Sequence, residues 1–209
     1  MVLGHRPMYC VVASAVGRCD EEHEASRRGL PSACPHNIPR ACRPAAAGAG
    51  CAAGRTFPVE QLFFEQGVDL AVFGHIHAYE RYWPVFDHTV LNGSTYVNDA
   101  TGDRYLNPGA TVHVTSGAGG NAEMRRGARL PPSGRCAGRS PWCAFQSGYG
   151  PAEGESGDYS YSRIEVHNAT HLRWAQVSHT LGRVVDEWSL EAHRHGPFAP
   201  PPAAAAATS

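Results

Sequence analysis

The segment from Thr56 to Gly74 limits the fold most, because it reads as a helix, a glycine and a short apolar strand. Pro58 suits the start of a helix, the apolar residues after it have helical spacing, and Gly67 suits a helix end. The mostly apolar run Val68–Phe73 then predicts a buried strand, of the kind that is usually parallel and covered on both faces. We therefore predict an α/β protein, in which ligands bind beyond the carboxyl ends of the strands.

Two histidines follow this strand directly. His75 and His77 stand two residues apart, so their side chains project from one side of an extended segment and can reach one metal ion or two adjacent ions. A pair of exposed loop histidines is the simpler interpretation, but the position at a strand end favours ligands. His5 has the same setting, because Met1–Leu3 reads as the stub of a buried strand and Gly4 follows it. We expect the three imidazoles at one sheet edge, where they suit zinc, iron or manganese.

The rest of the chain is predicted to be mainly β. Residues 111–116, 161–166, 172–177 and 184–190 read as strands, and the second and third form a hairpin that turns at 168–170. His113 alternates within the first of these strands and is expected in the core. The histidines in polar or tail segments are predicted to be ordinary surface residues: His36, His88, His167, His171, His179, His193 and His195.

Three segments differ in composition from the rest. Residues from about 30 to 55 are rich in Cys, Ala and Pro with little periodicity, which predicts an insertion of loop character. A short helix is expected near Asp20–Arg28, opened by acidic residues. Residues 192–209 end in prolines and alanines and are predicted to be a disordered tail.

Charge and cysteine content exclude several classes of function. Eighteen Arg and Lys residues against 19 Asp and Glu argue against a general nucleic-acid binder or a polybasic membrane binder. No run of about 18 apolar residues exists, so no transmembrane helix is expected. The seven cysteines form no Cys-x-x-Cys pair, which gives little support to a structural zinc site. With two N-glycosylation sequons, at Asn92 and Asn168, they favour an oxidising, secretory compartment.

Two stretches around the histidines resemble metal-ligand motifs of the purple acid phosphatases. Gly4–Cys10 is similar to the fourth motif, and Gly74–Pro84 to the fifth, Gly-His-x-His with its Tyr-Glu-Arg continuation. The likeness extends to the helix and strand before the fifth motif, the next strand and loop, and the closing β segments, at residues 61–70, 112–121 and 160–190. It covers most of residues 1–10 and 56–191 and is closest to the long animal and plant-type enzymes.

The resemblance implies a metallophosphoesterase α/β/β/α sandwich with its site at the strand ends. In that family a ferric ion and a divalent ion of iron, zinc or manganese share a bridging aspartate, and a phosphomonoester is attacked by an activated water. His5 and His75 would bind the divalent ion and His77 the ferric ion. His23 lies roughly where the family has a histidine that protonates the leaving oxygen, although a solvated helix start also explains it. The resemblance implies a secreted, vacuolar or lysosomal protein, and this sequence shows no signal peptide.

The chain departs from the family in one large respect. The first three motifs, which supply two Asp, a Tyr and an Asn, should precede His5 and are not in this sequence. Gly157–Tyr161 fits the second motif and Gly120–Glu123 imitates the third, but both lie downstream of the histidines, so we reject both. We expect residues 1–191 to be the C-terminal part of a phosphatase catalytic domain, lacking its N-terminal strands and inactive alone.

Two other functions stay open on the sequence. A degenerate phosphatase-like module could bind one metal ion or a phosphorylated ligand without turnover. A disulfide-rich secreted structural module would account for the seven cysteines. Their irregular spacing and the strand-end histidines argue against this last interpretation.

Overall fold

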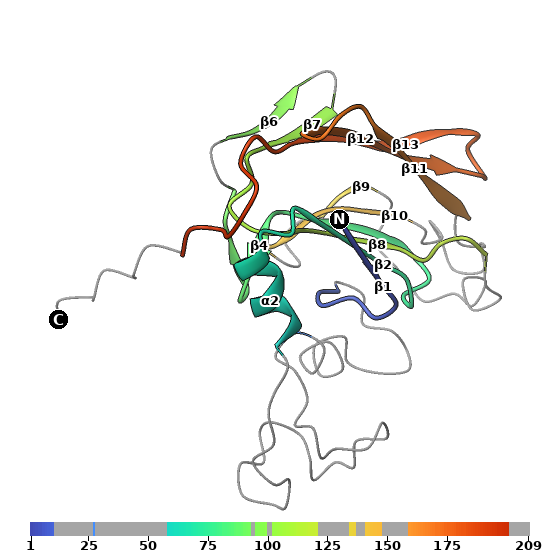
Figure 1. The fold of residues 1–209 in the computed structure, drawn as a ribbon. Helices are drawn as coiled ribbons and strands as arrows, with labels where there is room; N and C mark the ends of the chain where they lie inside the picture. Colours follow the sequence, from blue (N-terminus) through green and yellow to red (C-terminus); the bar gives the residue numbers. More distant parts are fainter. Residues whose placement is uncertain are drawn as a thin grey trace, which may run out of the picture.

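The computed structural model describes residues 1–10, 27, 58–92, 95–99, 102–120, 134–136, 141–147 and 159–200. In this part of the chain two β-sheets stack face to face, and one helix, α2 (Val59–Gln66), covers the outer face of the first sheet (Figure 1). The predicted insertion at 30–55 lies outside the described residues, and so does the helix expected near 20–28, apart from Arg27.

The first sheet has six strands in the order β1-β2-β8-β3-β10-β9. Its parallel strands are β1 (Val2–Gly4), β2 (Leu70–Phe73) and β8 (Val112–Ser116). Its antiparallel strands are β3 (Tyr79–Tyr82), β10 (Cys143–Ser147) and β9 (Gly134–Arg135). The predicted strand stub before His5 is therefore correct, and β1 and β2 end side by side.

The second sheet has five strands in the order β11-β12-β13-β7-β6. They are β11 (Ser160–Val166), β12 (His171–Ser178), β13 (Arg183–Glu191), β7 (Gly102–Leu106) and β6 (Thr95–Asp99). All neighbours are antiparallel except β13 and β7. A separate hairpin joins β4 (Val85–Phe86) to β5 (Thr89–Val90).

The alternation of side chains along β2 creates two cores. Leu70 and Val72 face the second sheet, whereas Ala71 and Phe73 face α2 and pack with Phe63. Strand β2 is thus covered on both faces, as its apolar sequence predicted. The predicted helix end is also confirmed, because Gly67 has left-handed φ of 63° and the helix stops there.

The segment 192–200 differs from the expected disordered tail. Ala192 is buried, and Phe198 packs on Phe64 while its N–H donates to the Phe64 carbonyl at 3.1 Å. A side chain at Gly67 would overlap the Gly196 carbonyl, since a Cβ there would lie 1.8 Å from that oxygen. This segment is ordered because an aromatic anchor and a glycine contact fix it to α2, and residues 201–209 lie outside the described part.

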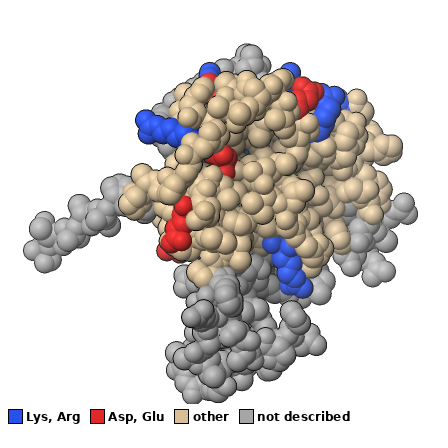
Figure 2. All heavy atoms as spheres, in the orientation of Figure 1, with Lys and Arg blue, Asp and Glu red and all other residues tan. Residues whose placement is uncertain are grey.

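A disulfide joins Cys136, just after β9, to Cys143 at the start of β10. Cys10 is disulfide-bonded as well. The face drawn in Figure 2 has scattered charges of both signs and no broad patch of either. Among the described helices, none has the length and apolar character that a membrane span requires.

The two sheets are joined by an arginine that is buried between them. Arg81 of β3 is 1% exposed, and its Nε and Nη2 donate to the two carboxylate oxygens of Asp186 at 2.7 and 2.9 Å. Nη2 also donates to Asp103 at 2.7 Å, and Nη1 to the Tyr105 hydroxyl at 2.5 Å. A single guanidinium therefore ties β3 of the first sheet to β7 and β13 of the second.

Aromatic side chains close this junction. The Tyr79 hydroxyl donates to Asp186 at 2.8 Å and accepts from Trp188 Nε1 at 3.2 Å. Burial and the neighbouring Asp186 carboxylate raise the pKa of Tyr79 well above its ordinary value, so the phenol remains a donor. Trp188 stacks on Trp174 with ring centroids 5.4 Å apart, which keeps water away from the ion pairs.

We expect Arg81→Leu to lower the free energy of unfolding by about 3–5 kcal/mol, because it leaves two buried carboxylates without their cation. Urea denaturation measures this loss. The control is Arg173→Gln, whose 2.7 Å pair with Glu187 is exposed and should contribute less than about 1 kcal/mol. Equal losses of unfolding free energy in the two variants would contradict the stabilising role of the Arg81 junction.

The buried histidine of β8 gives the fold a dependence on pH. His113 is 2% exposed, its Nδ1 has no hydrogen-bond partner, and burial lowers its pKa to about 3. The folded chain thus resists a proton that the unfolded chain accepts below about pH 6.5. The stability that neutral His113 contributes is complete above that pH and is lost as the pH falls.

We expect His113 to lower the free energy of unfolding by about 2 kcal/mol when the pH falls from about 7.5 to about 5. Urea denaturation at both pH values should show that His113→Leu reduces the difference between them by that amount. His179→Asn, at an exposed histidine, is the control and should leave the difference unchanged. The comparison is within each variant, so a general destabilisation by Leu does not affect it.

Candidate metal centre

Two consecutive tight turns carry the predicted ligands beyond β2. The Ile76 N–H donates to the Gly74 carbonyl and the Ala78 N–H to the Ile76 carbonyl, both at 2.8 Å. These bonds define γ-turns, with His75 and His77 at their centres. His75 has a φ of 65°, a conformation that costs a residue with a side chain about 1–3 kcal/mol and clusters at functional sites. The backbone is therefore strained at one of the predicted ligands.

Close backbone contacts hold this loop against its neighbours. The Gly74 N–H donates to the His5 carbonyl at 3.1 Å, which ties the end of β2 to the end of β1. The Gly117 N–H donates to the Ala78 carbonyl at 2.9 Å. A Cβ at Gly117 would lie 1.9 Å from the Ile76 carbonyl oxygen, so only glycine fits there. The loop that carries His75 and His77 is thus fixed by backbone on both sides.

The structure brings His5 and His75 together. His75 Nδ1 lies 3.2 Å from His5 Nε2, and the rings meet edge to face with centroids 5.0 Å apart. Two imidazole nitrogens that bind one ion at about 2.0–2.1 Å lie about 2.9–3.4 Å apart for bond angles between perpendicular and tetrahedral. The observed separation fits a shared ion. A hydrogen bond between the two rings fits it as well, with one nitrogen protonated.

The other predicted site residues are placed differently. His77 is half-buried in the next turn and does not join His5 and His75 in a compact cluster of three. In the described ranges, the group of three His, Cys, Asp or Glu ligand atoms that lie within 4.8 Å of one another is elsewhere, at His171, Glu191 and His193. His23 lies outside the described residues.

A buried polar network supports the residues that follow His5. The Tyr9 hydroxyl donates to Glu60 Oε1, and Arg27 Nη1 donates to Glu60 Oε2 at 3.1 Å and to Asp87 at 2.9 Å. Burial raises the pKa of Glu60, whereas the Tyr9 hydrogen bond and the Arg27 charge oppose the increase. Sequence reasoning missed this network. The sequence feature that could have indicated the network is Glu60, which lies on the apolar face of α2 one turn before the buried Phe63.

Sequence reasoning also missed the cluster of His171, Glu191 and His193. Its two histidines were predicted to be ordinary surface residues. They are partly or largely exposed, with side chains 39% and 49% accessible, but they share one carboxylate. The available signal was the pair Glu191 and His193 two positions apart after a predicted strand.

Comparison with known proteins gives three findings. A family described as iron/zinc purple acid phosphatase-like protein C matches residues 110–187. Acid phosphatase type 7 of Danio rerio is 34% identical over 200 residues, which are 95% of this chain and 36% of that protein. The human acid phosphatase type 7 is 30% identical over 188 residues, which are 90% of this chain and 33% of that protein. The chain spans about a third of the length of these relatives.

A solved structure has the same fold. Purple acid phosphatase PPD1 from yellow lupin seeds matches with a TM-score of 0.53 and 18% identity, covering 98% of this chain and 28% of its own. At this identity the match speaks for the fold alone. It confirms the predicted α/β fold class, which in the described residues has two large mixed sheets and few helical residues.

We expect Gly117→Ala to lower the free energy of unfolding by about 1–3 kcal/mol, because the added carbon overlaps the Ile76 carbonyl and the backbone must shift. The amide signals of residues 75–78 in a two-dimensional NMR spectrum should move with it. Gly119→Ala is the matched control, since a Cβ there meets nothing within 4 Å. Similar shifts in both variants would show that the loop does not depend on this contact.

Proposed function

This chain belongs to the purple acid phosphatase family, and on that premise we propose that it forms the C-terminal part of an acid phosphatase catalytic domain. The reaction proposed for the complete enzyme is hydrolysis of phosphomonoesters at a dinuclear metal centre. The observation that carries the proposal is the 3.2 Å approach of His5 and His75 at the ends of two neighbouring parallel strands. The proposed domain spans residues 1–191.

The donor atoms suit the metals that the family uses. His5 and His75 would hold the divalent ion, which we propose to be iron, zinc or manganese, and His77 would hold the ferric ion. Bound at these residues, the ions would supply Lewis acidity toward the phosphoryl oxygens and toward an attacking water. The two half-buried γ-turns would keep the two loop imidazoles oriented before an ion or substrate arrives. His23 remains the proposed proton donor to the leaving oxygen.

The ligand set of this sequence is too neutral for catalysis on its own. Three imidazoles carry no negative charge, whereas a trivalent and a divalent ion require anionic ligands around them. The three family motifs that supply two aspartates, a tyrosine and an asparagine are not in these 209 residues. We therefore propose that the 209-residue chain alone has no appreciable phosphatase activity.

The second candidate is binding without turnover. The His5–His75 pair suffices geometrically for one divalent ion, which is what a degenerate phosphatase-like module would retain. In that case the chain would bind one ion or a phosphorylated ligand at the strand ends and release it unchanged. Metal binding without hydrolysis in the longest natural form of the protein would favour this candidate.

The proposed compartment is secretory, vacuolar or lysosomal. The Cys136–Cys143 disulfide supports an oxidising compartment. Asn92 and Asn168, the proposed N-glycan positions, are both exposed, as glycan acceptors must be.

We expect the isolated chain, loaded with iron and zinc, to hydrolyse no p-nitrophenyl phosphate at mildly acidic pH. Turnover that disappears in His77→Ala would contradict this expectation. Sequencing the transcript upstream of the Met1 codon tests the wider proposal. A continuing frame that encodes the Gly-Asp, Gly-Asp-x-x-Tyr and Gly-Asn-His motifs in that order would support it.

The longer product then permits a quantitative test. In it, His75→Asn should lower kcat/KM at least about 100-fold, because losing a ligand costs more than the loss of an outer-shell partner. His179→Asn, at an exposed histidine, is the control and should leave kcat/KM unchanged. A frame that truly starts at Met1 would favour the binding module instead.

A further inference from the structure

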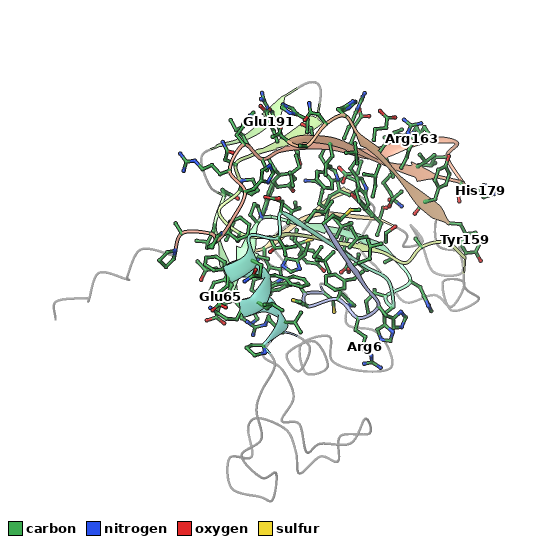
Figure 3. The ribbon with its side chains drawn as sticks, in the orientation of Figure 1. Arg6, Glu65, Tyr159, Arg163, His179 and Glu191 are labelled. Carbon is green, nitrogen blue, oxygen red and sulfur yellow. A yellow bond between two sulfur atoms is a disulfide. The ribbon has the colours of Figure 1, made fainter. Side chains whose placement is uncertain are left out.

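A second set of metal-ligand side chains lies on the other sheet. His171 at the start of β12 and Glu191 at the end of β13 are direct cross-strand partners. His193 stands two residues beyond Glu191, so it returns to the same face. The pairing continues past the strands, because the Ala192 N–H donates to the Thr170 carbonyl at 2.9 Å. In Figure 3, Glu191 lies on the opposite side of the molecule from Arg6, which adjoins His5.

The three side chains converge on one carboxylate oxygen. Glu191 Oε1 lies 3.2 Å from His171 Nε2 and 2.6 Å from His193 Nε2. The two rings meet edge to face with centroids 5.4 Å apart. All three ligand atoms lie within 4.8 Å of one another, so one ion can reach all of them.

Neighbouring groups determine which ring nitrogen of His171 carries the proton when the ring is neutral. Asn168 Oδ1 accepts the backbone N–H groups of Thr170 and His171 at 2.9 and 3.0 Å, so this atom is the amide oxygen. His171 Nδ1 lies 3.1 Å from the same oxygen and 2.6 Å from the Thr170 hydroxyl. With its proton on Nδ1, neutral His171 turns the Nε2 lone pair toward Glu191 Oε1. Two lone pairs that face each other at 3.2 Å require a cation between them, either a proton or a metal ion.

Hydrogen bonds also restrain the other two ligand residues. Arg104 Nη2 donates to Glu191 Oε2, which leaves Oε1 for the histidine side. The backbone N–H of His193 donates to Asn107 Oδ1 at 2.8 Å. Arg104 is an outer partner of the kind that typically orients metal ligands in proteins, whereas the Asn107 bond fixes the backbone of His193. The Arg104 charge also competes with a metal for Glu191, so the two histidines must supply much of the affinity.

We propose that His171, Glu191 and His193 form a surface site for one divalent transition-metal ion of borderline softness, with Zn²⁺ as the probe. Two imidazoles and one carboxylate are an established zinc ligand set, and three protein ligands leave a coordination position open. The partly exposed side chains place that position at the solvent. This site is independent of the strand-end histidines and of the proposed phosphatase activity.

The test is calorimetric titration of the full chain with ZnCl₂ in a background of His5→Asn and His75→Asn, which removes the strand-end pair. We expect one zinc ion per chain, and adding either His171→Asn or His193→Asn should weaken binding at least about 10-fold. Glu191→Gln should weaken binding as well, since it keeps the shape of the side chain and removes its charge. His179→Asn, at an exposed histidine in the turn between β12 and β13, is the matched control and should change nothing.

Two results of the titration would overturn the proposal. One is the absence of zinc binding in the background variant. The other is an affinity that neither His171→Asn nor His193→Asn changes, which would place the ion at another group. Far-UV circular dichroism shows whether each variant is folded, so that a loss of binding is not mistaken for unfolding. The visible absorption of bound Co²⁺ gives a second measure of metal binding. A Co²⁺ spectrum that persists in the His171→Asn, His193→Asn double variant would also refute the site.

Discussion

The two-sheet architecture depends on one buried guanidinium. Arg81 leaves β3 and meets carboxylates on β7 and β13, so sheets joined by long connections are bound at one point in their common core. Isolated buried charges are costly, but this one is fully paired and enclosed by Tyr79, Tyr105 and Trp188. Such a junction specifies one stacking of the sheets more strictly than apolar contacts would, because any sliding leaves a charge unpaired.

The sequence predicted the local elements of the first sheet well and the long-range polar contacts poorly. Helix, glycine and strand before His75 follow local rules of spacing and chain termination, and all three are present in the structure. The approach of His5 to His75 also follows, since parallel strands end at the same sheet edge. Arg81 was noticed only as part of a motif. Its partners lie 22 and 105 residues away, and no local pattern identifies them.

The cluster at His171 escaped prediction for a related reason. Cross-strand partners depend on the register of the hairpin, and a shift of one residue would turn His171 away from Glu191. The tail at 192–200 was missed because composition alone gives no weight to a single aromatic anchor such as Phe198. The two histidine groups also differ in charge. The strand-end pair is formed by two imidazoles, whereas the hairpin cluster includes its own anion.

Strand β3 is four residues long and connects the candidate ligand loop to the junction between the sheets. Its first residue follows directly from the turn at His77, and its third is Arg81, which binds the opposite sheet. Any fluctuation that separates the sheets must pull on the segment that positions the candidate ligands. The geometry of the strand-end site can therefore last no longer than the closed state of the sandwich, so amide hydrogen exchange in β3 reports on the lifetimes of both.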